Sequence, residues 1–219
     1  MTHRTRTWLV AFVVGGLVMA LPGAAIAQTD SNTTDIEVVD EHNSDIGEIK
    51  HRALHAIDKR LHTIARLTHR VEASNTVTDE HAKKLLRDLA DAAEGLKELA
   101  AKIRAAETIE ELRELVPMIG DFKINVLVKP KVNQVLKSDR IVAATKRLAE
   151  FSNKLEMLID RAEAAGYDVT RPERLLKRMR LNLRAAYEFG APVADMVIDL
   201  QPEYWPDPAK ETLKKGRRR

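Results

Sequence analysis

Apolar residues recur along the middle of the chain at alternating steps of three and four, the period of amphipathic helices that pack together. The clearest run follows Thr78, a suitable helix N-cap with Asp79 and Glu80 in the first turn. Its apolar positions are Ala82, Leu85, Leu89, Ala92, Leu96, Leu99, Ile103 and Ala106. An earlier run over residues 45–73 has the same period. We therefore predict two long helices separated by a break at residues 74–76.

Two further long helices are predicted in the second half of the chain. Thr108 and Glu111 form a capping-box pattern that starts a third, interrupted helix. The next long helix ends at Gly166, and its predicted buried seam is Ile141, Ala144, Leu148, Phe151, Leu155, Leu158, Ala162 and Ala165. A second capping-box pattern, Thr170 with Glu173, starts the last long helix, which we expect to kink at Pro192.

Short connections between long helices place neighbours antiparallel. The predicted fold is all-α: an elongated up-and-down bundle of about four long antiparallel helices, with a kinked helix near Pro117–Pro130. Val126–Val128 alone has the apolar character of a strand, but the sequence offers it no partner strand. The helical-bundle domain is expected over residues 45–200.

The two ends differ from this bundle in composition. Residues 1–27 combine a basic start with an apolar run from Trp8 to Met19 and then small residues, which predicts a signal peptide cleaved between Ala27 and Gln28. An uncleaved membrane anchor is the alternative. Residues 28–44 read as an acidic flexible leader, and residues 201–219 as a Pro-rich basic tail. The protein is therefore expected to leave the cell by the general secretory route and to be periplasmic, wall-associated or extracellular.

Composition narrows the chemistry. The chain has no cysteine, which excludes disulfides, thiol catalysis and cysteinyl metal sites. Signal cleavage would remove Arg4 and Arg6 from the 36 Lys and Arg residues, against 33 Asp and Glu, so the mature chain is nearly neutral. Nucleic acid is therefore not an expected partner.

Histidine is concentrated on the first predicted helix. At about 100° per residue, one stripe opposite the apolar seam carries His51, His55, His62 and His69. His51 and His55 have the i, i+4 spacing with which two imidazoles hold one Zn, Cu or Ni ion, although a strong site needs more ligands. The stripe predicts a metal-binding or pH-responsive surface, with an ordinary solvated face as the alternative.

The last long helix carries a basic face. Its cations are Arg171, Arg174, Lys177, Arg178, Arg180 and Arg184. Such a face suits wall polymers or anionic lipid headgroups, but no aromatic residue interleaves it for stacking on bases. The alternative is neutralisation within the bundle by Glu94, Glu98, Glu107, Glu110, Glu111 and Glu114. Tyr204–Trp205 is interpreted either as a membrane-interface anchor or as a cover for the end of the bundle.

Signs of an enzyme are sparse. The sequence has no Gly-x-Ser-x-Gly elbow, no phosphate-binding glycine loop and no dinucleotide fingerprint. The stretch Ala56-Ile57-Asp58-Lys59-Arg60-Leu61 resembles the opening helix of the chorismate mutases, which implies an all-helical enzyme with Arg and Lys in its bundle core. That reading is kept as the remote alternative.

Residues 108–117 (Thr-Ile-Glu-Glu-Leu-Arg-Glu-Leu-Val-Pro) and 126–132 (Val-Leu-Val-Lys-Pro-Lys-Val) resemble an uncharacterised family of exported helical-bundle proteins of actinobacteria and other prokaryotes. The resemblance implies export and an all-α fold, and it implies no activity, cofactor or binding residue. Periplasmic Spy-type helical chaperones are a looser comparison, since their Leu-Thr-x-x-Gln motif is absent.

The sequence thus predicts an exported, non-enzymatic helical bundle that acts by interaction at the cell envelope or outside the cell. The expected partners are a protein, a cell-wall polymer or a second copy of the chain, with peripheral contact to an anionic membrane as an alternative. Metal binding by the histidine stripe is the alternative function.

Overall fold

The structure, a computed structural model, describes residues 46–219, and these form an all-α unit with no strand in that range. The all-α fold class is thereby confirmed. The predicted signal peptide, its cleavage site between Ala27 and Gln28 and the acidic leader lie outside the described residues. Among the helices of residues 46–219, none is long and apolar enough to cross a membrane.

The first two helices form an antiparallel hairpin close to the predicted boundaries. Helix α1 spans Ile46–Glu72 and helix α2 spans Asp79–Ala105. The hydroxyl of Thr78 accepts a hydrogen bond from the backbone N–H of His81, which confirms the predicted N-cap. Both helices bury their apolar stripe along the hairpin, and Leu85, Leu89 and Leu96 are at most 1% exposed.

Three short helical segments occupy residues 109–128, where an interrupted third helix and a kinked helix near Pro117–Pro130 were expected. Helix α3 (Ile109–Leu115) starts with the predicted capping box of Thr108 and Glu111. A 3-10 turn, η1 (Pro117–Gly120), follows, and Lys123 adopts a left-handed backbone conformation, with φ of 47°. A π-helical turn, η2 (Ile124–Val128), then runs into the next helix. Val126 therefore lies in helical backbone, which excludes the strand.

The longest helix is α4 (Lys129–Ala164), and α5 (Thr170–Gly190) returns alongside it. Pro130 is tolerated because it lies in the first turn of α4, where backbone N–H groups have no helical partner. Gly166 has a φ of 83° and ends α4 as predicted. The predicted capping box of Thr170 and Glu173 is wrong: the backbone N–H of Thr170 donates instead to the Asp168 carboxylate.

The C-terminal segment is part of the helical unit. Helix α6 (Pro192–Val197) starts at Pro192, where the kink was expected, and the 3-10 turn η3 (Pro202–Tyr204) leads to helix α7 (Ala209–Arg217). Ala209 and Leu213 are almost completely buried against the core. The expectation of a tail outside the bundle from residue 201 was therefore wrong, because α7 carries an apolar face of its own.

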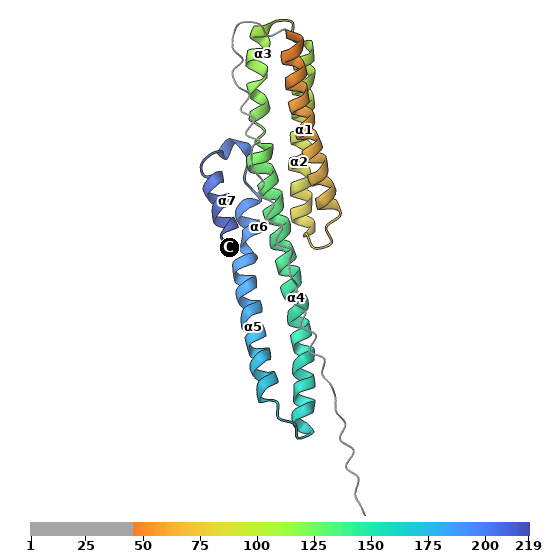
Figure 1. Ribbon diagram of the computed structural model, residues 1–219, viewed down its shortest axis with the longest axis vertical. Helices are drawn as coiled ribbons and strands as arrows, with labels where there is room; N and C mark the ends of the chain where they lie inside the picture. Colours follow the sequence, from red (N-terminus) through yellow and green to blue (C-terminus); the bar gives the residue numbers. More distant parts are fainter. Residues whose placement is uncertain (1–45) are drawn as a thin grey trace, which may run out of the picture. The chain divides into compact units, whose positions relative to one another are not determined.

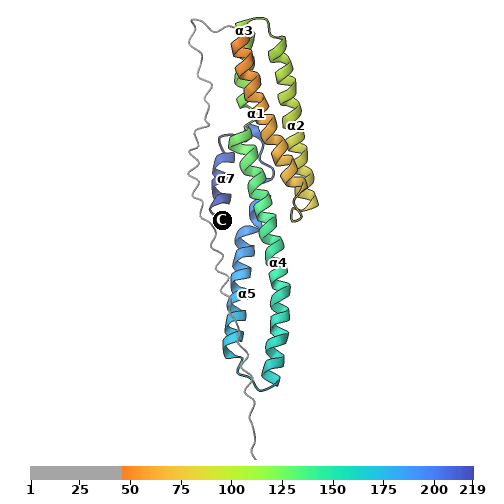
Figure 2. The same cartoon turned by 45° about the vertical axis from the view of Figure 1, so that its right-hand side comes forward.

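The helices surround the two halves of α4 differently (Figure 1). The hairpin of α1 and α2 lies beside the first half of α4, together with α6 and α7. The second half of α4 extends past the α1–α2 turn with α5 as its neighbour, and the turned view shows the same arrangement (Figure 2). The apolar core runs through the first region and includes Val132 and Val135 of α4, both completely buried.

Candidate functional site

The four predicted metal-binding histidines lie exposed along α1, on the side away from the core. The rings of His51 and His55 are stacked, with centroids 6.4 Å apart and an interplanar angle of 11°. His62 and His69 follow further along the same helix. Within residues 46–219 no group of three His, Cys, Asp or Glu side chains is placed to hold a metal ion. The histidine stripe is thus an exposed surface of α1. Within the described residues it provides two adjacent imidazoles without a third metal ligand.

The predicted basic face on α5 divides into two parts. Arg171, Arg174 and Arg178 are exposed on the surface of the helix. Arg180, in contrast, forms a bidentate ion pair with Glu156 of α4, with nitrogen–oxygen distances of 2.6 and 2.7 Å. The hydrogen bonds from Arg180 hold the pKa of Glu156 below its ordinary value. The neutralising acid therefore comes from α4 and is not one of the glutamates named from α2 and α3.

The remaining cations of the predicted basic face, Lys177 and Arg184, line a groove between α4 and α5. Its volume is about 630 Å³, and Lys177, Arg180 and Arg184 line it together with Glu156, Asp160 and Glu173. Arg184 also lies 3.9 Å from Glu188 on its own helix. Three cations facing three acids leave little net field for an anionic ligand. The positive and negative charges that line the groove between the two helices are therefore balanced.

The stretch that resembles chorismate mutases lies on the surface of α1. Asp58 and Lys59 are exposed, and Arg60 donates to the backbone carbonyl of Ala56 on its own helix. These three side chains do not converge on a cavity.

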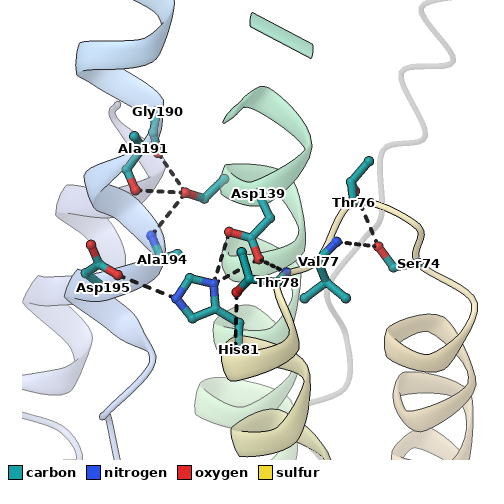
Figure 3. Close-up of polar contacts among 11 residues, drawn as sticks. Ser74, Thr76, Val77, Thr78, His81, Asp139, Gly190, Ala191, Ala194 and Asp195 are labelled. Atoms are coloured by element: carbon teal, nitrogen blue, oxygen red, sulfur yellow. Dashed lines mark hydrogen bonds and ion pairs between the residues drawn. The ribbon is translucent and has the colours of Figure 1, made fainter. Parts of the chain in front are cut away.

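A polar cluster that the sequence analysis did not single out joins α2, α4 and α6 (Figure 3). The Asp139 carboxylate lies 2.8 Å from Nδ1 of His81 and accepts a hydrogen bond from the backbone N–H of Thr78. Nε2 of His81 lies 3.5 Å from the carboxylate of Asp195. Asp139 is only 4% exposed, so these contacts compensate a carboxylate that has been removed from water.

The cluster resembles a catalytic His–Asp pair in composition but not in geometry. The far nitrogen of His81 faces a second carboxylate, whereas general-base catalysis requires it to face a nucleophile or substrate. The neighbouring Ser138 is buried, and its hydroxyl donates to the carbonyl of Gly190 and accepts from the backbone N–H of Ala194. These bonds satisfy backbone groups where α5 ends and α6 begins. The cluster therefore joins helices together.

A buried ion pair has the same effect at the start of α4. Nζ of Lys131 lies 2.6 Å from the Asp88 carboxylate of α2 and donates to the carbonyl of Leu200, and its side chain is 3% exposed. On the α7 side, Gln134 donates to the carbonyl of Leu213. Each polar residue buried in the first half of α4 thus contacts at least one neighbouring segment.

The second half of α4 departs most from the sequence analysis. The predicted seam was expected to be core, but Leu148 is 44%, Phe151 50% and Leu158 57% exposed. The residues buried against α5 are instead the small polar Thr145 and Ser152. The seam faces solvent because α5 packs about one residue position to its side. We call the exposed Leu148, Phe151 and Leu158 together with the half-buried Leu155 the α4 seam.

The α5 side contributes to the same exposed flank. Leu176 is buried against α4, and Lys177, which follows it, lines the charged groove. Leu175, which precedes it, is 56% exposed on the opposite flank. In an antiparallel pair the residues that precede the contact position on each helix fall on the same flank, so Leu175 lies on the side of Phe151. One flank of the hairpin thus carries the balanced charges of the groove together with the exposed Leu181, and the other carries the α4 seam and Leu175. We call the second the apolar flank.

Comparison of the chain with protein-family models, with curated proteins and with solved structures finds no match.

The Tyr204–Trp205 pair is divided between surface and core. Trp205 packs against the apolar core, whereas Tyr204 is 47% exposed. The side chain that a membrane-interface anchor would need most, Trp205, is therefore partly buried against the core.

Proposed function

We propose that the protein is an exported, non-enzymatic binding protein that acts at the cell envelope or outside the cell, through the apolar flank of the α4–α5 hairpin. The observation that supports this proposal is the exposure of the α4 seam. Soluble proteins seldom leave several large apolar side chains adjacent and uncovered unless the surface has a partner. Export rests on the signal-peptide pattern of residues 1–27.

The rest of the described unit supports binding over catalysis. The buried Asp139 and Lys131 and the partly buried His81 are engaged in contacts that hold helices together. The charged groove has its acids and bases balanced against one another. The α4 seam, in contrast, exposes apolar surface to water, which is unfavourable. A bound partner would remove that surface from water.

Site-specific crosslinking in the native host tests the proposal. A photoreactive amino acid is placed at Phe151, and in a control at Lys146, which is exposed on the other side of the same helix. We expect a discrete adduct from position 151 and none from position 146. Absence of an adduct at 151, or the same adducts at both positions, would reject the α4 seam as the functional surface.

A further inference from the structure

The α4 seam has the spacing of a coiled-coil interface. In heptad notation, Ile141, Leu148 and Leu155 occupy position a, and Phe151 and Leu158 occupy position d. A stripe confined to a and d is the narrow seam that one helix presents to another, whereas contact with a wide core uses a broader stripe. The shape of the apolar surface therefore suits a partner helix.

Only one side of this seam is covered by the chain itself. The e positions Thr145 and Ser152 are buried, and Arg180 of α5 donates to the hydroxyl of Ser152. Small side chains at these positions allow α5 to approach closely. A partner helix must therefore lie on the other side, against the g positions of α4.

The g positions are uniformly basic. They recur every seven residues as Arg140, Arg147, Lys154 and Arg161. All four side chains are exposed, and none of them forms an ion pair within residues 46–219. Residues at e and g select coiled-coil partners by their charge. A helix that docks beside this basic row would therefore need acidic residues at the facing positions, because opposite charges attract.

The α5 side of the same flank is basic as well. Arg171 and Arg178 stand four residues before and three residues after Leu175, so all three share one helix face. Three acids of the hairpin, Glu156, Asp160 and Glu173, line the opposite groove, whereas Glu150 stands between Arg147 and Lys154 on α4. Cations therefore border the apolar flank along both of its helices.

A hollow marks where a docked helix would meet the rest of the unit. It has a volume of about 370 Å³ and is lined by residues 74–76 of the α1–α2 turn and by Arg140, Ala144 and Arg147 of α4. Leu148, the first residue of the α4 seam, follows Arg147 directly, and the second half of α4 extends beyond the α1–α2 turn (Figure 1).

From these observations we infer that the α4–α5 hairpin binds an amphipathic α-helix with acidic flanks, supplied by another protein, which lies along the α4 seam. This inference rests on the proposed function and names the chemistry of its partner. The apolar face of the partner covers Leu148, Phe151, Leu155 and Leu158, and its acidic flanks pair with the g row of α4 and with Arg171 and Arg178.

Two other occupants fit less well. A second copy of the hairpin would bring the same basic rows against each other, and like charges across an interface are repulsive. An anionic membrane would attract the same cations. However, a lipid surface does not require apolar residues in heptad spacing, and α5 already covers one side of the α4 seam.

Binding of synthetic helices tests the inference. The probes are two stapled amphipathic helices of three heptads with Leu at a and d, one with Glu and the other with Lys at e and g. The protein is purified as the cell produces it and titrated by fluorescence anisotropy. We expect the Glu-flanked helix to bind at least about tenfold more tightly than the Lys-flanked one. We also expect R147E/K154E to reverse that order.

The matched control is K97E/K146E, which makes the same change in net charge at exposed positions away from the flank, and it should bind like the wild type. Equal affinity for both probes, or no effect of R147E/K154E, would overturn the acidic-helix inference while leaving any Phe151 adduct intact. Seam-dependent dimerisation in sedimentation equilibrium, or flotation with anionic phospholipid vesicles without probe binding, would also overturn it. A missing Phe151 adduct rejects the proposed function itself, so the two failures are distinguishable.

Discussion

The two halves of α4 have the same helical period and opposite surroundings. In the first half, Val132 and Val135 are completely buried among helices on several sides, and Lys131 and Asp139 form buried polar contacts to α2. In the second half, α5 is the neighbour, and the largest apolar side chains face solvent. One continuous helix therefore serves as core in one region and as an uncovered surface in the other.

This difference separates stability from binding. Free energy of folding is concentrated where burial is complete, because the hydrophobic contribution scales with the apolar area removed from water. A hairpin of two helices cannot cover its own apolar stripe on every side. The second half of α4 is thus held by the first half and by α5, and its seam remains available to a partner.

Removing the charge of Lys131 should destabilise the first region most strongly. Lys131→Met leaves the Asp88 carboxylate without its cation and the Leu200 carbonyl without its donor. We expect the free energy of unfolding to fall by about 3–5 kcal/mol, the usual cost of breaking a buried pair. Urea unfolding followed by circular dichroism measures it.

Two further variants make this result specific. Lys137→Met changes an exposed lysine of the same helix, and it should stay within about 0.5 kcal/mol of the wild type. Lys131→Met combined with Asp88→Leu replaces both charges by apolar groups and should recover much of the loss. A loss below about 1 kcal/mol for Lys131→Met alone would show that the pair does not hold α2 to α4.

A matched pair of leucine truncations sharpens the comparison between the regions. Leu89 is 1% and Leu158 57% exposed. Leu89→Ala should cost about 2–5 kcal/mol because it opens a cavity in the core. Leu158→Ala should change the free energy of unfolding by about 0.5 kcal/mol or less while weakening binding of the Glu-flanked helix. Equal destabilisation by the two truncations would contradict the division into core and binding surface.

Local signals in the sequence predicted the helices well. The boundaries of α1 and α2, the caps at Thr78 and Thr108 and the end of α4 at Gly166 depend on residues within one turn of each boundary. Such contacts are formed by neighbours in the chain, so the order of residues is enough to find them.

Whether another segment covers an apolar helix face depends on distant parts of the chain. The sequence pattern alone does not predict it. The period of the α4 seam shows that a stripe is apolar, but not whether any segment reaches it. The bond between His81 and Asp139 joins residues 58 positions apart. One signal was available: Asp139 interrupts an apolar row that includes Val132, Val135 and Val142, and a charge in such a row needs a buried partner.

The smallest expected effect concerns the charged flank of the hairpin. The pKa of Glu156 lies below its ordinary value of 4.5 because Arg180 donates hydrogen bonds to the ionised carboxylate. A carboxyl with a lowered folded-state pKa stabilises the fold above its ordinary pKa, and this contribution is lost as the pH falls through the lowered value. Acid should therefore loosen the contact between the second half of α4 and α5.

Hydrogen exchange of the α4–α5 amides at pH 7 and pH 3 measures this loosening. Glu156→Gln should lower protection of the hairpin at pH 7 and reduce its further change at pH 3, since the titrating group is gone. Glu163→Gln, at an exposed site near the end of α4, should keep the wild-type response. If Glu156→Gln and the wild type respond identically to acid, the pair with Arg180 does not hold the hairpin, and Thr145, Ser152 and Leu176 carry the contact without it.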